Sequence, residues 1–302
     1  MSKKKKNRIR SREDVIVDIV VHILVGLVAI CCLYPIIYCV SMSLSDDNAI
    51  LTSSVVLLPK GINLDSYKLV FQQSDVTNAL KNSIFYTVLG TGLQLCGTLT
   101  YGYVLSRKNF VFKKFLTVFT LIPMLFGGGL IPSFLLIKSL HLYNTVWALV
   151  LPSAVSIWNA LLAKTFFQST IPTDVIESAV IDGCSDFQIF IRIVLPLSTT
   201  IIAILGLYAA VGYWNDYFTA LIYLEDVDKK PLQLLLKEIL SASSNSSTLN
   251  GMLDPNAYRE NLVNATRMKY VMIVVSTLPI IVVYPFIQKF FVKGVMLGSI
   301  KE

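Results

Sequence analysis

Apolar residues in this chain gather into six long runs separated by polar segments. Most of these runs reach the roughly 20 residues that an α-helix needs to cross a bilayer. Since backbone polar groups inside lipid must be satisfied within the protein, such runs predict helices. The predicted membrane helices lie at about 15–40, 82–105, 115–137, 145–167, 199–224 and 270–291. The pattern predicts an all-α polytopic membrane protein with one transmembrane domain over residues 1–302.

Composition supports this fold class. The chain is 54% hydrophobic and only 15% charged, whereas soluble domains are about 45–50% apolar and about 25% charged. A soluble protein with long buried helices is the weaker alternative. The start, MSKKKKNRIRSRE, resembles the first part of a signal peptide, but the apolar run after it is too long and no A-x-A site follows. We therefore interpret the first run as an uncleaved membrane helix.

Basic residues are distributed unevenly between the two sides that six crossings define. With a cytoplasmic N-terminus, the inside segments hold 16 of the 26 basic residues and 8 acidic ones, against 10 and 10 outside. The positive-inside rule then predicts cytoplasmic N- and C-termini in the cell membrane. The net charge of +7 reflects this orientation, so we expect lipid contact and no nucleic-acid partner. Residues 225–269 become an extracellular loop, in which PLQLLLKEIL should form a short amphipathic helix on or beside the membrane and the Ser/Asn-rich stretch 241–250 should be flexible.

Cysteine and histidine give no sign of a metal site. The five cysteines include no C-x-x-C pair, and the two histidines are far apart in the sequence. Zinc sites need closely spaced Cys and His ligands. We expect no metal on this chain.

One polar-edged segment, ESAVIDGCSDFQIFIRIVLP, interrupts the apolar pattern on the predicted cytoplasmic side. Asp174 and Glu177 have the spacing of a capping box, with Thr173 as an alternative cap. Gly183 suits the left-handed residue that ends a short helix. Ser185 and Gln188 repeat the capping pattern, and the second helix should end before Pro196. Two such short helices cannot bury an apolar face alone. The residues leave open whether the membrane bundle or another protein covers it.

This segment also resembles the cytoplasmic loop signature of permease subunits in binding-protein-dependent ATP-binding-cassette importers. The match consists of Glu177-Ser-Ala179, then Gly183 and Ile193 with nine residues between them, and Leu195-Pro196; Ser178 departs from it, since the family usually has Ala there. Pieces such as GGGLIPSFLLIKSL and YWNDYFTALIYL extend the similarity to the sugar-permease branch, and within it to the Gram-positive group tied to complex oligosaccharides. The resemblance implies an ATPase-docking loop over 173–196 whose contact residues are Glu177, Ser178, Ala179, Asp182, Gly183, Phe187, Ile193, Leu195 and Pro196.

The resemblance further implies a six-helix type I importer half. Its partners would be an ATP-binding subunit dimer, a second permease forming a heterodimer, an extracellular solute-binding lipoprotein and a sugar. The chain contains no G-x-x-x-x-G-K-[ST] sequence, which P-loop ATPases use to hold phosphate. We therefore expect no catalytic residue and no cofactor here, with ATP and Mg²⁺ bound by the partner. A stand-alone secondary carrier and a non-transporting membrane scaffold remain the alternatives.

Polar residues within the apolar runs are candidates for the translocation path. Tyr213, Trp214, Asn215 and Asp216 fall in the outer half of the fifth run. Tyr and Trp could stack on sugar rings while Asn and Asp bind hydroxyls; the alternative is an interfacial aromatic belt. For the isolated amides Gln94 and Asn159 we expect hydrogen bonds between helices.

Overall fold

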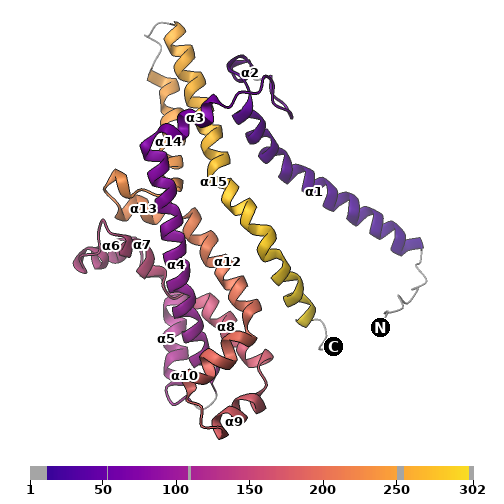
Figure 1. Ribbon diagram of the computed structural model, residues 1–302, viewed down its shortest axis with the longest axis vertical. Coiled ribbons are helices and arrows are strands. Elements are labelled where there is room, and N and C mark those ends of the chain that lie inside the picture. Colours follow the sequence, from indigo (N-terminus) through magenta and orange to yellow (C-terminus); the bar gives the residue numbers. More distant parts are fainter. Residues whose placement is uncertain (1–11, 53, 108–109, 250–254, 299–302) are drawn as a thin grey trace. The chain divides into compact units, whose positions relative to one another are not determined.

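The computed structural model of the chain describes residues 12–52, 54–107, 110–249 and 255–298, and no strand occurs among them. These residues form two compact units, 1–70 with 243–274, and 71–242 with 275–302. The prediction of one domain over the whole chain stays a prediction. The helices, seen in Figure 1, are α1 (Arg12–Leu44), α2 (Asp47–Leu51), α3 (Asp65–Gln72), α4 (Ser74–Ser106), α5 (Lys113–Leu125), α6 (Leu130–Ser139), α7 (Val146–Val150), α8 (Ile157–Thr170), α9 (Thr173–Ile181), α10 (Asp186–Ile189), α11 (Leu195–Leu197), α12 (Thr199–Asn215), α13 (Phe218–Tyr223), α14 (Leu232–Leu249) and α15 (Pro255–Gly298). Three short turns complete them: η1 (Leu151–Ser153), η2 (Phe190–Val194) and η3 (Val227–Lys229).

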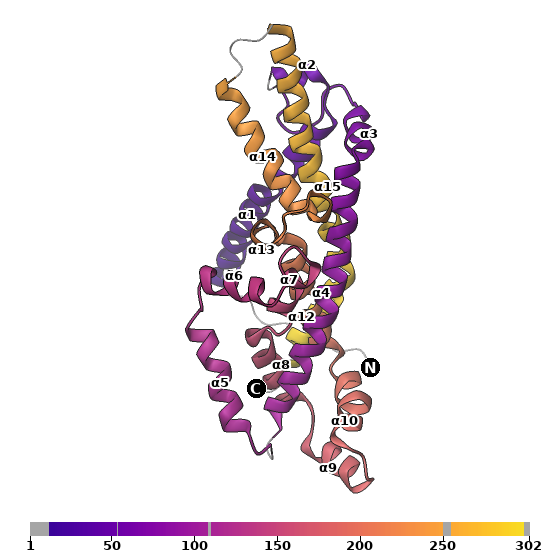
Figure 2. The same ribbon diagram turned by 90° about the vertical axis from the view of Figure 1, so that its left-hand side faces the viewer.

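The larger unit is built around α4, which packs along both α8 and α12 (Figures 1 and 2). Small residues on α4 permit this close approach. A Cβ at Gly97 would lie 2.7 Å from the Ala154 carbonyl oxygen, and one at Gly102 would lie 2.8 Å from the Ala163 Cβ. The buried Thr98 hydroxyl accepts a hydrogen bond from the Ser156 N–H at 3.2 Å. The small residues Gly97, Thr98 and Gly102 therefore form a helix-packing surface on α4.

The smaller unit joins the C-terminal end of α1 to the segment around α2 and to the first half of α15. Tyr38 and Tyr270 meet edge to face, with ring centroids 5.9 Å apart. Arg267 is buried and forms an ion pair with Asp47. The Asp46 carboxylate caps α2 by accepting from the Ala49 N–H at 2.8 Å. These contacts fix the chain where it leaves the first long apolar helix.

Length and composition identify two continuous helices among the described residues that could cross a membrane, Glu13–Leu44 and Val263–Phe286. Counting each of three bent helix pairs as one span raises the number to five. Six spans were predicted, and the helix missing from this count is α4, which covers the predicted span 82–105. The Gly and Thr residues with which α4 packs against its neighbours, together with Gln94, lower its hydropathy and explain the difference.

Several predicted boundaries need correction. The predicted span 115–137 is broken into α5 and α6, whose axes differ by 117°. The break is the Gly127–Gly129 sequence, in which Gly129 has a φ of 81°, a conformation that glycine adopts without strain. The predicted span 199–224 ends early, because α12 stops at Asn215 and α13 follows.

Residues 225–269, predicted as a loop, are largely helical. α14 continues through Leu249 and α15 begins at Pro255, so the stretch 241–249 is helix and not an irregular segment. Ser and Asn are only a few tenths of a kcal/mol worse than average helix formers. Extending a helix that Leu232–Leu240 has already nucleated is therefore cheap. The charged start of the chain, residues 1–11, lies outside the described residues.

Candidate functional site

The first helix of the predicted docking segment, α9, ends as its sequence predicts. Gly183 has a φ of 79°, and its N–H donates to the Val180 carbonyl at 3.0 Å. The Cys184 N–H donates to the Ala179 carbonyl at 2.9 Å. These two bonds define a Schellman motif, which satisfies the last carbonyls of a helix. Gly183 therefore fixes the turn between the two helices of the segment.

The start of α9 differs from the prediction. The helix begins at Thr173, and its N-cap, Pro172, makes no side-chain capping bond. The capping box with Asp174 as cap is therefore wrong, and Thr173 is not the cap either. Pro172 is extended, with φ −61° and ψ 137°, and it has no polar side chain, so α9 starts after it without a side-chain cap.

The second helix shows one predicted feature and one departure. Ser185 and Gln188 form a complete capping box, in which the Gln188 N–H donates to the Ser185 hydroxyl and the Ser185 N–H donates to the Gln188 side chain. The expected stop before Pro196 is wrong, because helical structure continues through Leu197. The π turn η2 precedes Pro196. Its i→i+5 hydrogen bonds close a larger ring than those of an α-helix, which leaves room for the proline against the preceding turn.

The inner face of this helix pair is anchored in the bundle. Phe190 packs against Tyr103 of α4, with the rings tilted by 31° and their centroids 4.8 Å apart, and Tyr103 meets Phe167 of α8 edge to face at 6.3 Å. Ala179, Ile189 and Val194 are buried in the same cluster. The bundle thus covers one apolar face of the segment and sets its position.

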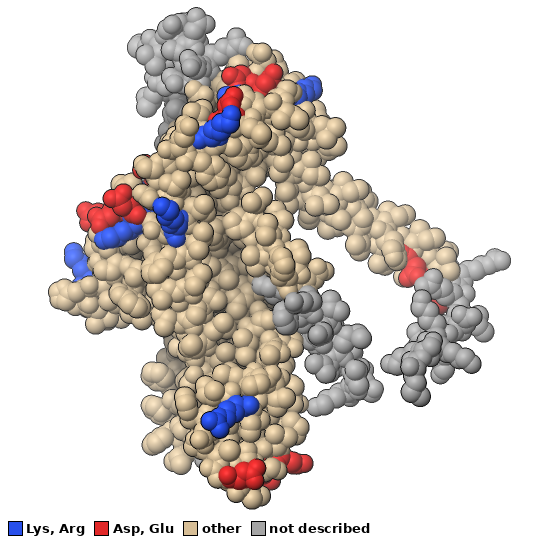
Figure 3. Space-filling view, viewed as in Figure 1, with Lys and Arg blue, Asp and Glu red and all other residues tan. Residues whose placement is uncertain are grey.

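The outer face carries apolar side chains that nothing in the described chain covers. Ile181 is 85% exposed, Phe187 is 72% exposed and Val180 is also exposed, on both sides of Gly183. Acidic side chains surround them, and Figure 3 shows acidic groups at the end of the molecule that holds α9. The exposed acidic residues of the segment are Asp174, Glu177, Asp182 and Asp186. The bundle therefore covers one apolar face of the segment, and the other face stays exposed within the described chain.

The structure divides the predicted docking residues between these faces. The exposed ones are Glu177, Ser178, Asp182, Gly183, Phe187 and Pro196. Ala179 is buried, and Ile193 and Leu195 are partly buried against the bundle cluster. The Ser178 hydroxyl donates to the Asp174 carbonyl of its own helix at 2.8 Å. The substitution of Ser for the usual Ala at this position is therefore accommodated within α9.

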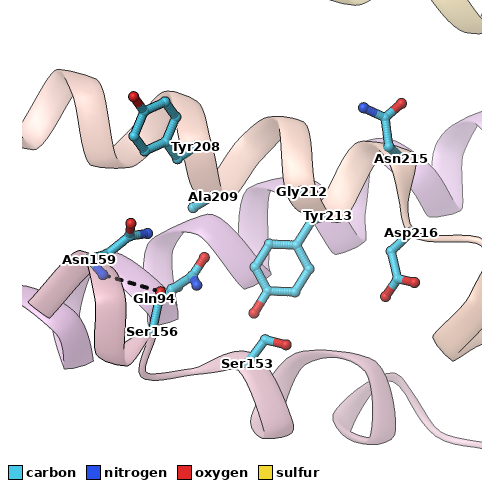
Figure 4. A pocket seen from close by; sticks show the side chains of 10 residues that line it. All are labelled: Gln94, Ser153, Ser156, Asn159, Tyr208, Ala209, Gly212, Tyr213, Asn215 and Asp216. Atoms are coloured by element: carbon cyan, nitrogen blue, oxygen red, sulfur yellow. Dashed lines mark hydrogen bonds between the residues drawn. The ribbon is translucent and has the colours of Figure 1, made fainter. Parts of the chain in front are cut away.

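A second candidate site is a polar cavity of about 420 Å³ beside α12 (Figure 4). Figure 4 shows the Tyr213 ring extending from α12 toward Ser153, with Gln94 of α4 beside it. Such a volume lies within the ~300–1,000 Å³ typical of ligand pockets. The lining residues are Gln94, Ser153, Ser156, Asn159, Tyr208, Ala209, Gly212, Tyr213, Asn215 and Asp216.

The four residues predicted for the translocation path separate in the structure. Tyr213, Asn215 and Asp216 line the cavity, whereas Trp214 is buried on another side of α12 and donates its ring N–H to the Ser276 carbonyl at 2.9 Å. The Tyr213 hydroxyl donates to the Val150 carbonyl at 3.1 Å. Trp214 is thus placed to hold α12 against α15, and Tyr213 is fixed as part of the cavity wall.

Sequence reasoning missed most of the remaining lining of the cavity. Gln94 and Asn159 were expected to bond between helices, but neither side-chain amide has a hydrogen-bond partner within the described part of the chain, and both line the cavity. Ser153, Ser156 and Tyr208 were not singled out at all. The available signal was weak, because single polar residues in apolar helices are usually packing contacts.

Comparison with known proteins agrees with this architecture. Residues 95–297 match the family model described as "Binding-protein-dependent transport system inner membrane component". The chain is 40% identical to the "Polygalacturonan/rhamnogalacturonan transport system permease protein YtcP" of Bacillus subtilis (strain 168), covering 94% of this chain and 98% of the relative. It is 41% identical to "Protein LplC" of the same organism, over 88% of each chain.

A solved structure shows the same fold. It is described as the "crystal structure of a bacterial ABC transporter involved in the import of the acidic polysaccharide alginate". The TM-score is 0.83 at 32% identity, covering 94% of this chain and all of that one. The chain therefore belongs to the family of binding-protein-dependent transport system inner membrane components, and it is a transmembrane permease subunit of an ATP-binding-cassette importer.

Proposed function

We propose that this chain forms half of the translocation path of an ATP-driven oligosaccharide importer and couples to a separate ATPase through residues 173–196. The observation that carries the proposal is the exposed surface of Val180, Ile181 and Phe187 around Gly183. Contiguous exposed apolar side chains with a polar rim are typical of protein interaction sites. The acidic rim favours a partner groove lined with basic side chains.

The connection between the two sites supports a mechanical role. The second docking helix leads through Ser198 directly into α12, with an 84° change of direction. Ile189 and Val194 on one side of the bend share a buried cluster with Ile201 and Leu205 on the other. A displacement of the docking helices therefore moves the near end of α12. Its far end, about 21 Å away at ~1.5 Å per residue, carries Tyr213 and the cavity.

The remaining components follow from this role. The ATP-binding partner supplies ATP, Mg²⁺ and the catalytic residues, so this chain is non-catalytic and holds no cofactor. A second permease completes the path as a heterodimer, and an extracellular binding lipoprotein delivers the cargo. Both termini lie in the cytoplasm of a Gram-positive bacterium, which places the docking helices on the side where ATP is available.

Carbohydrate cargo is supported by the name of one relative, which refers to polygalacturonan/rhamnogalacturonan, and by the description of the solved structure, which refers to the polysaccharide alginate. The cavity chemistry agrees, because amide and hydroxyl side chains with two tyrosine rings suit a polyhydroxylated ligand. Asp216 and Asn215 supply further hydrogen-bonding groups on the same wall.

Uptake in the native host tests the proposal. Deleting the chain should abolish ATP-dependent uptake of at least one member of a panel of labelled oligosaccharides, and re-expression should restore it. Unchanged uptake of every oligosaccharide after deletion would contradict carbohydrate import. Membrane content of the restored chain, measured by immunoblot, controls for expression.

A further inference from the structure

One basic side chain joins the C-terminal end of α4 to the docking segment. Arg107 is the C-cap of α4, and its side chain is 25% exposed. It forms an ion pair with Asp186 in the first turn of α10, with the guanidinium nitrogen and the carboxylate oxygen 3.5 Å apart. The guanidinium carbon also lies 5.5 Å from the centroid of the Tyr103 ring. Arg107 therefore contacts α4 and the second docking helix at the same time.

An aromatic contact continues this connection. The buried Tyr103 ring packs against Phe190, which follows directly after α10, with the ring centroids 4.8 Å apart. The Arg107 guanidinium is held over the same ring, and such a cation is attracted more strongly as water is excluded. Loss of the guanidinium would therefore weaken the ion pair and the support of the aromatic contact together.

Helix α4 leads from this contact to the cavity. It runs from Ser74 to Ser106 and contains no proline, the residue that most often kinks a helix. Gln94 of α4 lines the cavity (Figure 4), about 20 Å from Arg107 at ~1.5 Å per residue. The docking segment thus has two connections to the cavity, one through Ser198 into α12 and one through Arg107 into α4.

We propose that Arg107 is a positioning residue for transport, which ties the second docking helix to α4 so that the ATPase moves α4 together with α12. The inference rests on the proposed docking function and names a residue through which docking reaches the cavity. Without the guanidinium, the docking helices shift against α4 while they still displace α12. The two helices that line the cavity then no longer move as one body, and each ATP hydrolysed drives less uptake.

The test measures oligosaccharide uptake per ATP hydrolysed. The complete transporter, with its partner chains, is reconstituted in proteoliposomes and offered the labelled oligosaccharide that wild type takes up fastest. Arg107→Gln removes the charge. Arg107→Lys keeps it, and because a single guanidinium nitrogen contacts Asp186, an ammonium group can replace it. Lys114→Gln is the matched control, since Lys114 is exposed and lies in the first turn of α5.

Arg107→Gln should lower uptake per ATP about two- to fivefold, the scale of one ion pair and one cation–π contact near the surface. Co-purification of the ATPase should stay unchanged, Arg107→Lys should recover most of the loss, and Lys114→Gln should match wild type. Asp186→Asn should act in the same direction. Its side chain is 80% exposed, so this variant keeps the fold. Combining it with Arg107→Gln should add little, because both changes break one contact.

Four results would overturn the inference and leave the proposed function intact. These are equal uptake per ATP for Arg107→Gln and Lys114→Gln, a loss that Arg107→Lys does not reduce, fully additive effects of Arg107→Gln and Asp186→Asn, and loss of the ATPase from Arg107→Gln. The last would mean that Arg107 serves docking itself. A wild-type transporter that takes up no oligosaccharide of the panel with ATP would overturn both.

Discussion

The ring of Tyr213 on α12 lies directly against Gly90 on α4. A Cβ at Gly90 would approach the Tyr213 Cζ to 2.6 Å, which no real Cβ contact allows. The Tyr213 hydroxyl is tied at the same time to the Val150 carbonyl. The cavity wall therefore depends on the absence of a side chain at one position of the neighbouring helix.

Substituting Gly90 should disturb the cavity without unfolding the bundle. Gly90→Ala is expected to cost about 1–3 kcal/mol, as overpacking does, and to reduce oligosaccharide uptake because Tyr213 must move. Thermal unfolding of the purified protein and uptake in cells measure the two effects. Gly92→Ala is the control on the same helix, since nothing lies within 4 Å of its Cβ. Equal uptake by the two variants would contradict the role given to the Gly90–Tyr213 contact.

The turn at Gly183 should be needed for ATPase association. Its positive φ costs a residue with a Cβ about 1–2 kcal/mol, so Gly183→Val should distort the surface of Ile181 and Phe187 and release the ATPase. Asn tolerates the left-handed conformation, and Gly183→Asn should retain association. Co-purification of the ATPase with each tagged variant, at equal membrane content, is the measurement. Normal association of Gly183→Val would remove the docking assignment.

The two faces of the docking segment should respond differently to truncation. Phe187→Ala should weaken ATPase binding and leave the melting temperature of the isolated subunit almost unchanged, because Phe187 is exposed. Ile189→Ala should lower that melting temperature, since removing a fully buried Ile side chain costs about 2–5 kcal/mol. If Phe187→Ala lowered the melting temperature of the subunit as much as Ile189→Ala does, Phe187 would be packed within the subunit, which would contradict its role in ATPase binding.

Asn159 should matter for transport and little for stability. Its amide is unpaired within the described chain, so Asn159→Ala removes no internal hydrogen bond and should reduce oligosaccharide uptake with normal membrane content. Thr165→Ala on the same helix is the control, because Thr165 is exposed and its hydroxyl bonds only to the Leu161 carbonyl. Wild-type uptake by Asn159→Ala would argue against cargo binding at this wall.

Local sequence predicted the docking segment well because its signals act over a few residues. Gly183 and the Ser185–Gln188 capping box follow from backbone conformation and from hydrogen bonds three residues apart. The two wrong predictions, at Asp174 and Pro196, also concern interactions over a few residues. Pro172 takes the N-cap position of α9 in place of a polar residue, and the π turn η2 allows the second helix to continue past Pro196. Neither choice alters the apolar pattern, so the pattern could not reveal them.

The cavity could be predicted only in part because it assembles from distant segments. Tyr213, Asn215 and Asp216 stand out as polar residues in one apolar run, but Trp214 shares that signal and points elsewhere. Gln94 and Asn159 are brought to the same space by the packing of α8 and α12 on α4, which sequence spacing does not encode. A count of spans by length and hydropathy omits α4 for a related reason, since α4 gains its place through small and polar residues.

The most direct test of the central claim is to identify what co-purifies with the tagged chain from its native host in gentle detergent. The account predicts that mass spectrometry finds a P-loop ATPase and a second permease, and that the ATPase is lost from Gly183→Val but kept by Gly183→Asn. A chain that purifies alone or as a homo-oligomer, and still moves solute in proteoliposomes, would contradict an ATP-driven permease subunit and favour a stand-alone carrier.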